Sequence, residues 1–179
     1  MDSPLTDDEF ADAFRTFATT AFRLELQPAY AEPVEQETVA KFLAGQPERP
    51  SDVPGIREWL EQVSQMAREG RRIERVRVHE DPPTDYQRWE RWAGQWNVDA
   101  GEMIHYLTRR QAEDAGLLPA VGGDDWWLLD SSRLIIMRFD ECCRRISNNL
   151  VTEQESIEQA CAWRDLAVRA ATGHPPVTA

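Results

Sequence analysis

The sequence is poor in the residues that build metal centres, disulfides and redox sites. Its three cysteines are an odd set, with Cys142 beside Cys143 and Cys161 farther along the chain, and none has zinc-ligand or Cys-x-x-Cys spacing. The three histidines are also far apart. We therefore expect reduced thiols, no metal site and no bound cofactor.

Long apolar runs are missing as well. No apolar stretch approaches the roughly 20 residues that a membrane-spanning helix needs. The first nine residues lack the basic and apolar segments of a secretory signal. We therefore expect a cytoplasmic protein with no membrane partner.

Positive charge is scarce, since 20 Lys and Arg stand against 32 Asp and Glu, and the formal net charge is −12. A nucleic-acid backbone or an anionic membrane repels such a chain, so we expect no direct nucleic-acid partner. The hydrophobic share of 41%, with 7 tryptophans, is still enough for a buried core and excludes a disordered chain.

The sequence also lacks the common catalytic motifs. It contains no phosphate-binding loop, no Gly-x-Gly-x-x-Gly, no Gly-x-Ser-x-Gly and no His-Glu-x-x-His. These motifs therefore indicate no particular reaction, and we assign no catalytic and no metal-binding residue from the sequence.

Helical and strand periodicities alternate along the chain. Thr6 and Thr84 each stand three residues before a Glu or Gln, which is the capping box that opens a helix. Alternating apolar residues indicate strands. The predicted helices cover 7–20, 34–44, 56–70, 84–96 and 152–173, the predicted strands cover 22–26, 72–79, 103–107, 126–129, 134–139 and 144–148, and 111–124 is expected to be a loop.

This order predicts an α+β fold with a mixed or antiparallel sheet, packed helices and a C-terminal hairpin around Asp130-Ser131-Ser132. The length predicts one domain over 1–179. Within it we expect a helical N-terminal part over 1–70, an α+β core over 71–173 and a short Pro-rich tail over 174–179.

Four charged residues lie in two pairs, each pair on one face of a predicted strand. Arg23 and Glu25 lie on one face of the first strand, and Arg75 and Arg77 lie on one face of the next, about 7 Å apart. If the two strands are neighbours, the four side chains form one cluster. Paired guanidiniums suit a small anionic ligand. The alternative is an internal ion-pair network with Glu25 or Glu74.

Tryptophan and tyrosine side chains gather in the second half of the chain. Tyr86 and Trp89 fall on one stripe of a predicted helix, and Trp126 and Trp127 point to opposite faces of their strand. Such side chains line a flat-ligand pocket in one interpretation and form core in the other. We expect Trp92 or Trp126 to be partly exposed.

The carboxylates Glu102, Asp125, Asp130 and Asp140 stand at predicted element ends, where caps and turns account for them. In an enzyme, Glu102, Asp130 or His105 would supply acid–base chemistry while the arginine pair anchors the substrate. The candidate ligand-binding residues are Arg23, Glu25, Arg75, Arg77, Tyr86, Trp89, Glu102, Trp127 and Asp130.

Several short segments resemble an uncharacterised actinobacterial family of cytosolic proteins over about residues 20–172. They are Ala21-Phe22-Arg23-Leu24-Glu25, Phe42-Leu43-Ala44-Gly45, Arg75-Val76-Arg77-Val78, Thr84-Asp85-Tyr86, Asp125-Trp126-Trp127-Leu128-Leu129-Asp130 and Met137-Arg138-Phe139-Asp140. Genes of that family commonly lie beside helix-turn-helix regulators, so the resemblance implies a basic DNA-binding protein as partner. Cys142-Cys143-Arg144 departs from the family, which often has an acidic-glycine turn there.

Three functions follow as hypotheses. The first is an accessory regulatory or ligand-sensing protein that acts with a DNA-binding partner and catalyses no reaction. The second is a small enzyme of specialised metabolism with an anionic substrate. The third is an interaction protein of the toxin–antitoxin type.

Overall fold

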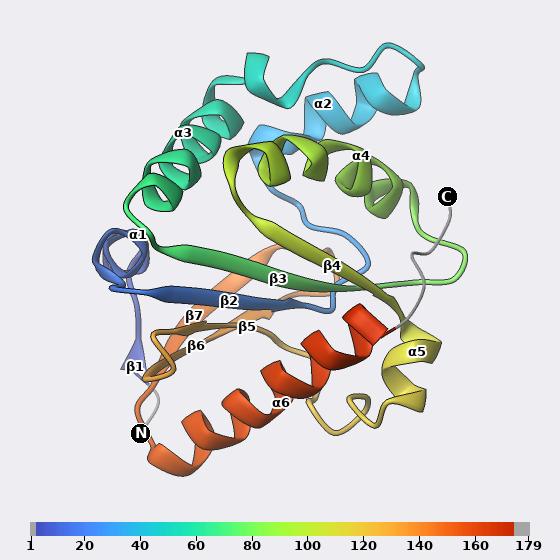
Figure 1. The fold of residues 1–179 in the computed structure, drawn as a ribbon. Helices are drawn as coiled ribbons and strands as arrows, with labels where there is room; N and C mark the ends of the chain where they lie inside the picture. The colour runs from blue at the N-terminus through green and yellow to red at the C-terminus, as the bar shows by residue number, and fades with distance from the viewer. Residues whose placement is uncertain (1–2, 174–179) are drawn as a thin grey trace.

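The chain builds a seven-stranded sheet with helices on both faces, and the computed structural model describes residues 3–173 (Figure 1). The elements are β1 (Ser3–Pro4), α1 (Asp7–Thr16), β2 (Thr20–Glu25), α2 (Pro33–Leu43), the short 3-10 helix η1 (Pro50–Asp52), α3 (Pro54–Arg68), β3 (Arg72–His79), α4 (Asp85–Ala100), β4 (Met103–Thr108), α5 (Arg109–Asp114), β5 (Asp125–Leu129), β6 (Arg133–Phe139), β7 (Arg145–Val151) and α6 (Gln154–Gly173). The strands lie in the order β1-β7-β6-β5-β2-β3-β4.

The sheet is mixed and changes direction at β2. β2, β3 and β4 run parallel, whereas β5 pairs antiparallel with β2, and β6 and β7 continue antiparallel from β5. The predicted α+β fold and its C-terminal hairpin are thereby confirmed. β2, from the N-terminal part over 1–70, lies between β5 and β3, so this part contributes a strand to the sheet. The tail over 174–179 lies outside the described residues.

The two faces of the sheet have different covers. α5 and α6 pack on one face, which we call the α6 face, and α1, α2, α3 and α4 lie over the other, which we call the α4 face (Figure 1). Because side chains alternate along a strand, β2 and β3 send apolar residues to the α6 face. Phe22, Leu24, Val76 and Val78 are buried there with side chains of α5 and α6. The α4 face receives Arg23, Glu25, Arg75 and Arg77, whereas Glu74 lies on the α6 face in register with Phe22.

Helix starts follow the capping signals. The Thr6 and Thr84 side chains each accept a hydrogen bond from the backbone of the third helical residue, as predicted. The predicted loop over 111–124 was wrong at its beginning, because α5 covers Arg109–Asp114. A third capping box opens α5, in which Thr108 accepts from the Gln111 backbone and the Gln111 side chain accepts from the Thr108 backbone.

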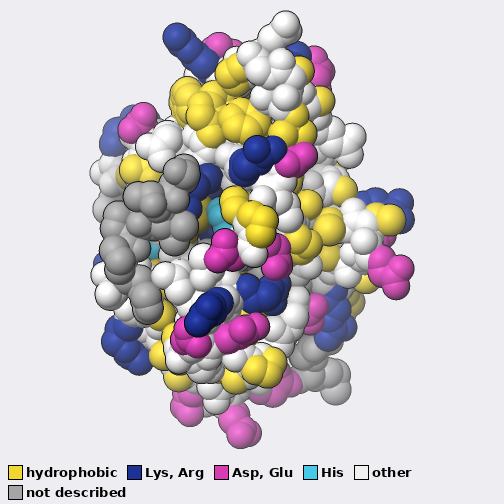
Figure 2. All heavy atoms as spheres, turned by 90° about the vertical axis from the view of Figure 1, so that its right-hand side faces the viewer, with side chains coloured by type: hydrophobic (Ala, Val, Ile, Leu, Met, Phe, Trp, Pro, Cys, Tyr) yellow, Lys and Arg dark blue, Asp and Glu magenta, His cyan; other side chains and the backbone are white. Residues whose placement is uncertain are grey.

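The prediction that Trp92 or Trp126 is partly exposed is confirmed by Trp92. Trp92 is half-buried, and its ring lies 5.3 Å from that of Phe42, whereas Trp126 is only 4% exposed. Figure 2 shows one side of the molecule, on which apolar side chains gather toward the α2 end and charges of both signs are interspersed elsewhere. Among the described helices, none has the length and apolarity that crossing a membrane requires.

Candidate functional site

A cavity of about 710 Å³ lies between the α4 face of the sheet and the helices above it. β2 and β3 contribute its charged side chains, together with Trp127 of β5, and α1, α2, α3 and α4 contribute its walls. The volume is in the range of small-molecule pockets.

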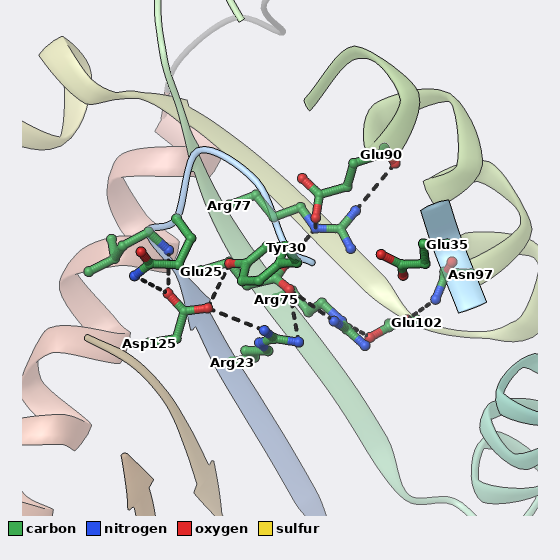
Figure 3. A network of polar contacts seen from close by, with 12 residues as sticks. Arg23, Glu25, Tyr30, Glu35, Arg75, Arg77, Glu90, Asn97, Glu102 and Asp125 are labelled. Carbon is green, nitrogen blue, oxygen red and sulfur yellow. Dashed lines mark hydrogen bonds and ion pairs between the residues drawn. The ribbon is translucent and has the colours of Figure 1, made fainter. Parts of the chain in front are cut away.

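The predicted charged cluster forms at this cavity. In the parallel register Arg23 pairs with Arg75 and Glu25 pairs with Arg77, so all four side chains share the α4 face. Glu25 is the centre of the cluster (Figure 3). Its Oε1 lies 3.0 Å from Arg23 Nη1 and 3.1 Å from Arg75 Nη1, and its Oε2 lies 2.5 Å from Arg77 Nε. The ion-pair interpretation is therefore confirmed.

Each guanidinium also has a second carboxylate partner. Arg23 donates to Asp125 at 3.2 Å, Arg75 donates to Glu102, and Arg77 Nε lies 3.2 Å from Glu90. A further layer holds these carboxylates in place: Tyr30 Oη donates to Asp125 at 2.6 Å, Asn97 Nδ2 donates to Glu102 at 2.7 Å, and His79 Nε2 lies 3.1 Å from Glu90. The cluster is thus buried and highly connected.

Burial and the neighbouring positive charges shift the pKa values of the buried carboxylates in opposite directions. Burial favours the neutral form of Glu25, but the positive charges of Arg23, Arg77 and Arg75 outweigh it and hold the pKa of Glu25 well below its usual range. Burial raises the pKa of Asp125, which attraction to Arg23 offsets only in part. Glu25 is therefore ionised at neutral pH, as its three guanidinium partners require.

Aromatic rings form the walls around the charged floor. Tyr86 of α4 lies 5.3 Å from Trp89 and 5.7 Å from Tyr30, ring centroid to ring centroid. The Arg75 guanidinium lies 5.1 Å from the Trp127 ring and 5.6 Å from the Trp59 ring. The predicted Tyr86, Trp89 and Trp127 therefore line the same cavity as the predicted arginines.

Glu35 of α2 is a further carboxylate on the cavity wall. It accepts a hydrogen bond from Tyr86 Oη at 2.6 Å. Burial raises its pKa to about 7, against the opposing effect of that hydrogen bond and with the help of the negative charges of Glu90 and Glu32. A partly buried carboxyl with a raised pKa in a cavity is typical of functional sites.

Two donors on the cavity wall are left unsatisfied. Arg23 Nε and Trp89 Nε1 are buried and have no hydrogen-bond partner among the described residues. Unsatisfied buried donors are rare in folded proteins because each one costs free energy.

None of the three expected acid–base residues lines the cavity. Asp130 lies in the β5–β6 turn, where it accepts from the backbone N–H groups of Ala18 and Thr19 at 2.8 and 2.7 Å. His105 lies 3.0 Å from Glu74, in register with Val76 of the α6 face. Glu102 is only 2% exposed and lies behind Arg75. The proposed convergence of these groups in one cleft was therefore wrong.

In the described part of the chain, no group of three or more His, Cys, Asp or Glu side chains is placed to hold a metal ion. A family model described as a domain of unknown function (DUF6879) matches residues 8–176. The chain belongs to this family. No curated protein matches the sequence.

The sequence alone does not mark every contributor to the site of this DUF6879 protein. Asp125 stands at a predicted strand end, where a turn accounts for it, and Tyr30, Glu35 and Glu90 are not among the predicted site residues. One signal was available for Glu90, which falls one residue after Trp89 on the aromatic helix. Glu35 carried no such signal, because only the packing of α2 beside α4 brings it to Tyr86.

Proposed function

We propose that this protein binds a small organic molecule in the cavity and signals its presence to a partner protein. The observation that carries the proposal is the cavity itself, with aromatic walls, a rigid charged floor and two buried donors that lack a partner. Such a combination of apolar walls and a few oriented polar groups is typical of ligand sites. The ligand would offer oxygen or nitrogen acceptors to Arg23 Nε and Trp89 Nε1.

The signalling half of the proposal rests on the family resemblance and on charge. A formal net charge of −12 favours docking on a basic protein, since complementary charge speeds and orients association. The resemblance points to a helix-turn-helix regulator encoded nearby. Co-purification with that regulator, followed by DNA-binding assays with and without this chain, tests the idea. If no complex forms and DNA binding is unchanged, the signalling half is wrong.

Ligand binding is tested with a variant that fills the cavity from its rim. Gln62→Trp places a large ring at a half-buried α3 residue that lines the cavity, and Glu61→Trp adds the same ring at the exposed neighbouring residue. A small-molecule library is screened by thermal unfolding. At 100 times its Kd, a ligand should raise the Tm of the wild type and of Glu61→Trp by about 5–10 °C.

The same ligand should leave the Tm of Gln62→Trp unchanged. Compounds that stabilise all three proteins equally bind elsewhere. If only such compounds are found, the cavity is not a ligand site and the proposal fails.

Glu35 favours a second candidate function, a small enzyme. A carboxyl group with a pKa of about 7 in a cavity is suited to general acid–base catalysis at neutral pH. The test incubates wild type and Glu35→Gln with a ligand found in the screen and follows its mass. Turnover by the wild type that Glu35→Gln lowers by 100-fold or more supports an enzyme, whereas an unchanged ligand supports a sensor.

A further inference from the structure

The carboxylates around the cavity fall into two groups. Glu25, Glu90, Glu102 and Asp125 each contact at least one guanidinium. Glu35 and Glu32 differ, because neither makes an ion pair with a described residue, and the hydrogen bond to Glu35 comes from the neutral hydroxyl of Tyr86. A partly buried carboxylate without an ion-pair partner is costly, so Glu35 is a place where an added positive charge is favourable.

The charge balance of the cluster points the same way. Its three guanidiniums, those of Arg23, Arg75 and Arg77, are shared among four carboxylates, and Glu35 adds a fifth. The two arginines at the cavity rim are engaged as well, since Arg15 lies 3.3 Å from Asp12 and Arg145 lies 3.7 Å from Asp7. An anionic ligand would compete with carboxylates already in place, whereas a cation would not.

Aromatic faces complete the arrangement beside Glu35. Tyr86, which donates to Glu35, is one member of the Tyr30–Tyr86–Trp89 wall, whose neighbouring rings lie 5.7 and 5.3 Å apart. Ammonium groups bind favourably over tyrosine and tryptophan faces, and a carboxylate beside the rings accepts their N–H hydrogens.

We propose that the ligand of this cavity carries an amine, and that its ammonium group binds Glu35 beside the Tyr86 and Trp89 rings. This inference rests on the proposed ligand-binding function and adds the chemical class of the ligand. It also revises the anionic ligand expected from the sequence, because the arginines that suggested one are paired internally.

The proposal predicts a pH dependence with a definite sign. The charged or titratable groups that face Glu35 are Tyr86 and Glu90 of α4, Arg77 of β3 and Glu32 before α2. The pKa of Glu35 is raised to about 7, so its carboxylate forms as pH rises through neutrality. An alkylammonium, with a pKa near 10, stays charged over that range. Amine binding should therefore strengthen from pH 6 to pH 8.

Three probes of equal ring size test the inference: 2-phenylethylamine, 2-phenylethanol and phenylacetate. Binding is measured by NMR titration of the isotope-labelled full-length protein at pH 6 and pH 8. At pH 8 the amine should bind at least about tenfold more tightly than the alcohol or the acid. From pH 8 to pH 6 its affinity should fall about tenfold, because Glu35 becomes protonated.

Two variants assign the effect to Glu35. Glu35→Gln should remove both the amine preference and the pH dependence, whereas Glu37→Gln, an exposed residue of the same helix, should keep both. Tyr86→Phe keeps the ring and deletes the hydroxyl. Because the Tyr86 hydrogen bond lowers the pKa of Glu35, this variant should move the midpoint of the pH dependence upward.

The outcomes separate the inference from the function on which it rests. Tighter binding of phenylacetate, equal affinity of the three probes, or no binding of the amine overturns the amine assignment. Those results leave the proposed ligand binding to be decided by the library screen with Gln62→Trp. If the amine binds the wild type, and if Gln62→Trp abolishes and Glu35→Gln weakens that binding, both the ligand-binding function and the amine assignment are supported.

Discussion

The two faces of β2 and β3 are built from the same strands, and over residues 23–25 and 75–77 they differ in chemistry. On the α6 face Leu24 and Val76 are buried among apolar side chains of α5 and α6. On the α4 face Glu25 and Arg75 are as deeply buried, but in a network of ion pairs. Buried ion pairs seldom stabilise more than well-packed apolar residues. Stability alone therefore does not account for the charged face, whereas the proposed ligand site, with its oriented polar groups, would account for it.

The largest effect is expected from breaking the charged face at its centre. Glu25→Ala leaves three buried guanidiniums without their shared carboxylate, and we expect a loss of about 4 kcal/mol of unfolding free energy. Urea unfolding at pH 7 measures it. Glu61→Ala, at an exposed residue of α3, is the control and should change the free energy by less than about 0.5 kcal/mol. A loss below about 1 kcal/mol for Glu25→Ala would mean that the network is weakly coupled.

The adjacent residue tests the apolar face. Leu24 is 0% exposed, so Leu24→Ala removes buried methyl groups and leaves a cavity, with an expected loss of about 3 kcal/mol. The same urea titration measures it. This variant should keep the pH dependence of amine binding, because its side chain points away from Glu35. If that pH dependence is lost, the two faces are not independent.

The smallest effect concerns Glu35 and depends on pH. Its folded pKa, about 7, is raised above the ordinary value of 4.5, so the stability that Glu35 contributes is present at low pH and is lost as pH rises toward 7. Glu35→Gln cannot ionise. The Tm of Glu35→Gln relative to wild type should therefore increase by about 5–10 °C between pH 5 and pH 8. A difference that is constant with pH would contradict the raised pKa.

Local sequence signals predicted most of the fold. The Thr6 and Thr84 capping boxes marked two helix starts, and apolar alternation marked β2 and β3 with the correct residues on each face. These signals involve residues close in sequence, which is why they are readable without the fold. The missed start of α5 had the same kind of signal at Thr108.

The candidate site was predictable only in part. Arg23, Glu25, Arg75 and Arg77 could be grouped because strand alternation places them on one face. Their carboxylate partners could not be predicted from spacing. Asp125 reaches the cluster because β5 pairs with β2, and Glu102 reaches it because it follows the end of α4. Asp130 was placed in the site by its residue type, although backbone N–H groups hold it in a turn.

By itself, the amino-acid sequence determined the helices, the strands, the charged face and the aromatic stripe, because each depends on periodicity within a short segment. The tertiary structure alone decided that the arginines pair internally and that Glu35 reaches the same cavity without a cationic partner. The physical reason is that ion pairing and the pKa of a buried carboxyl depend on which distant charges packing brings within a few ångströms.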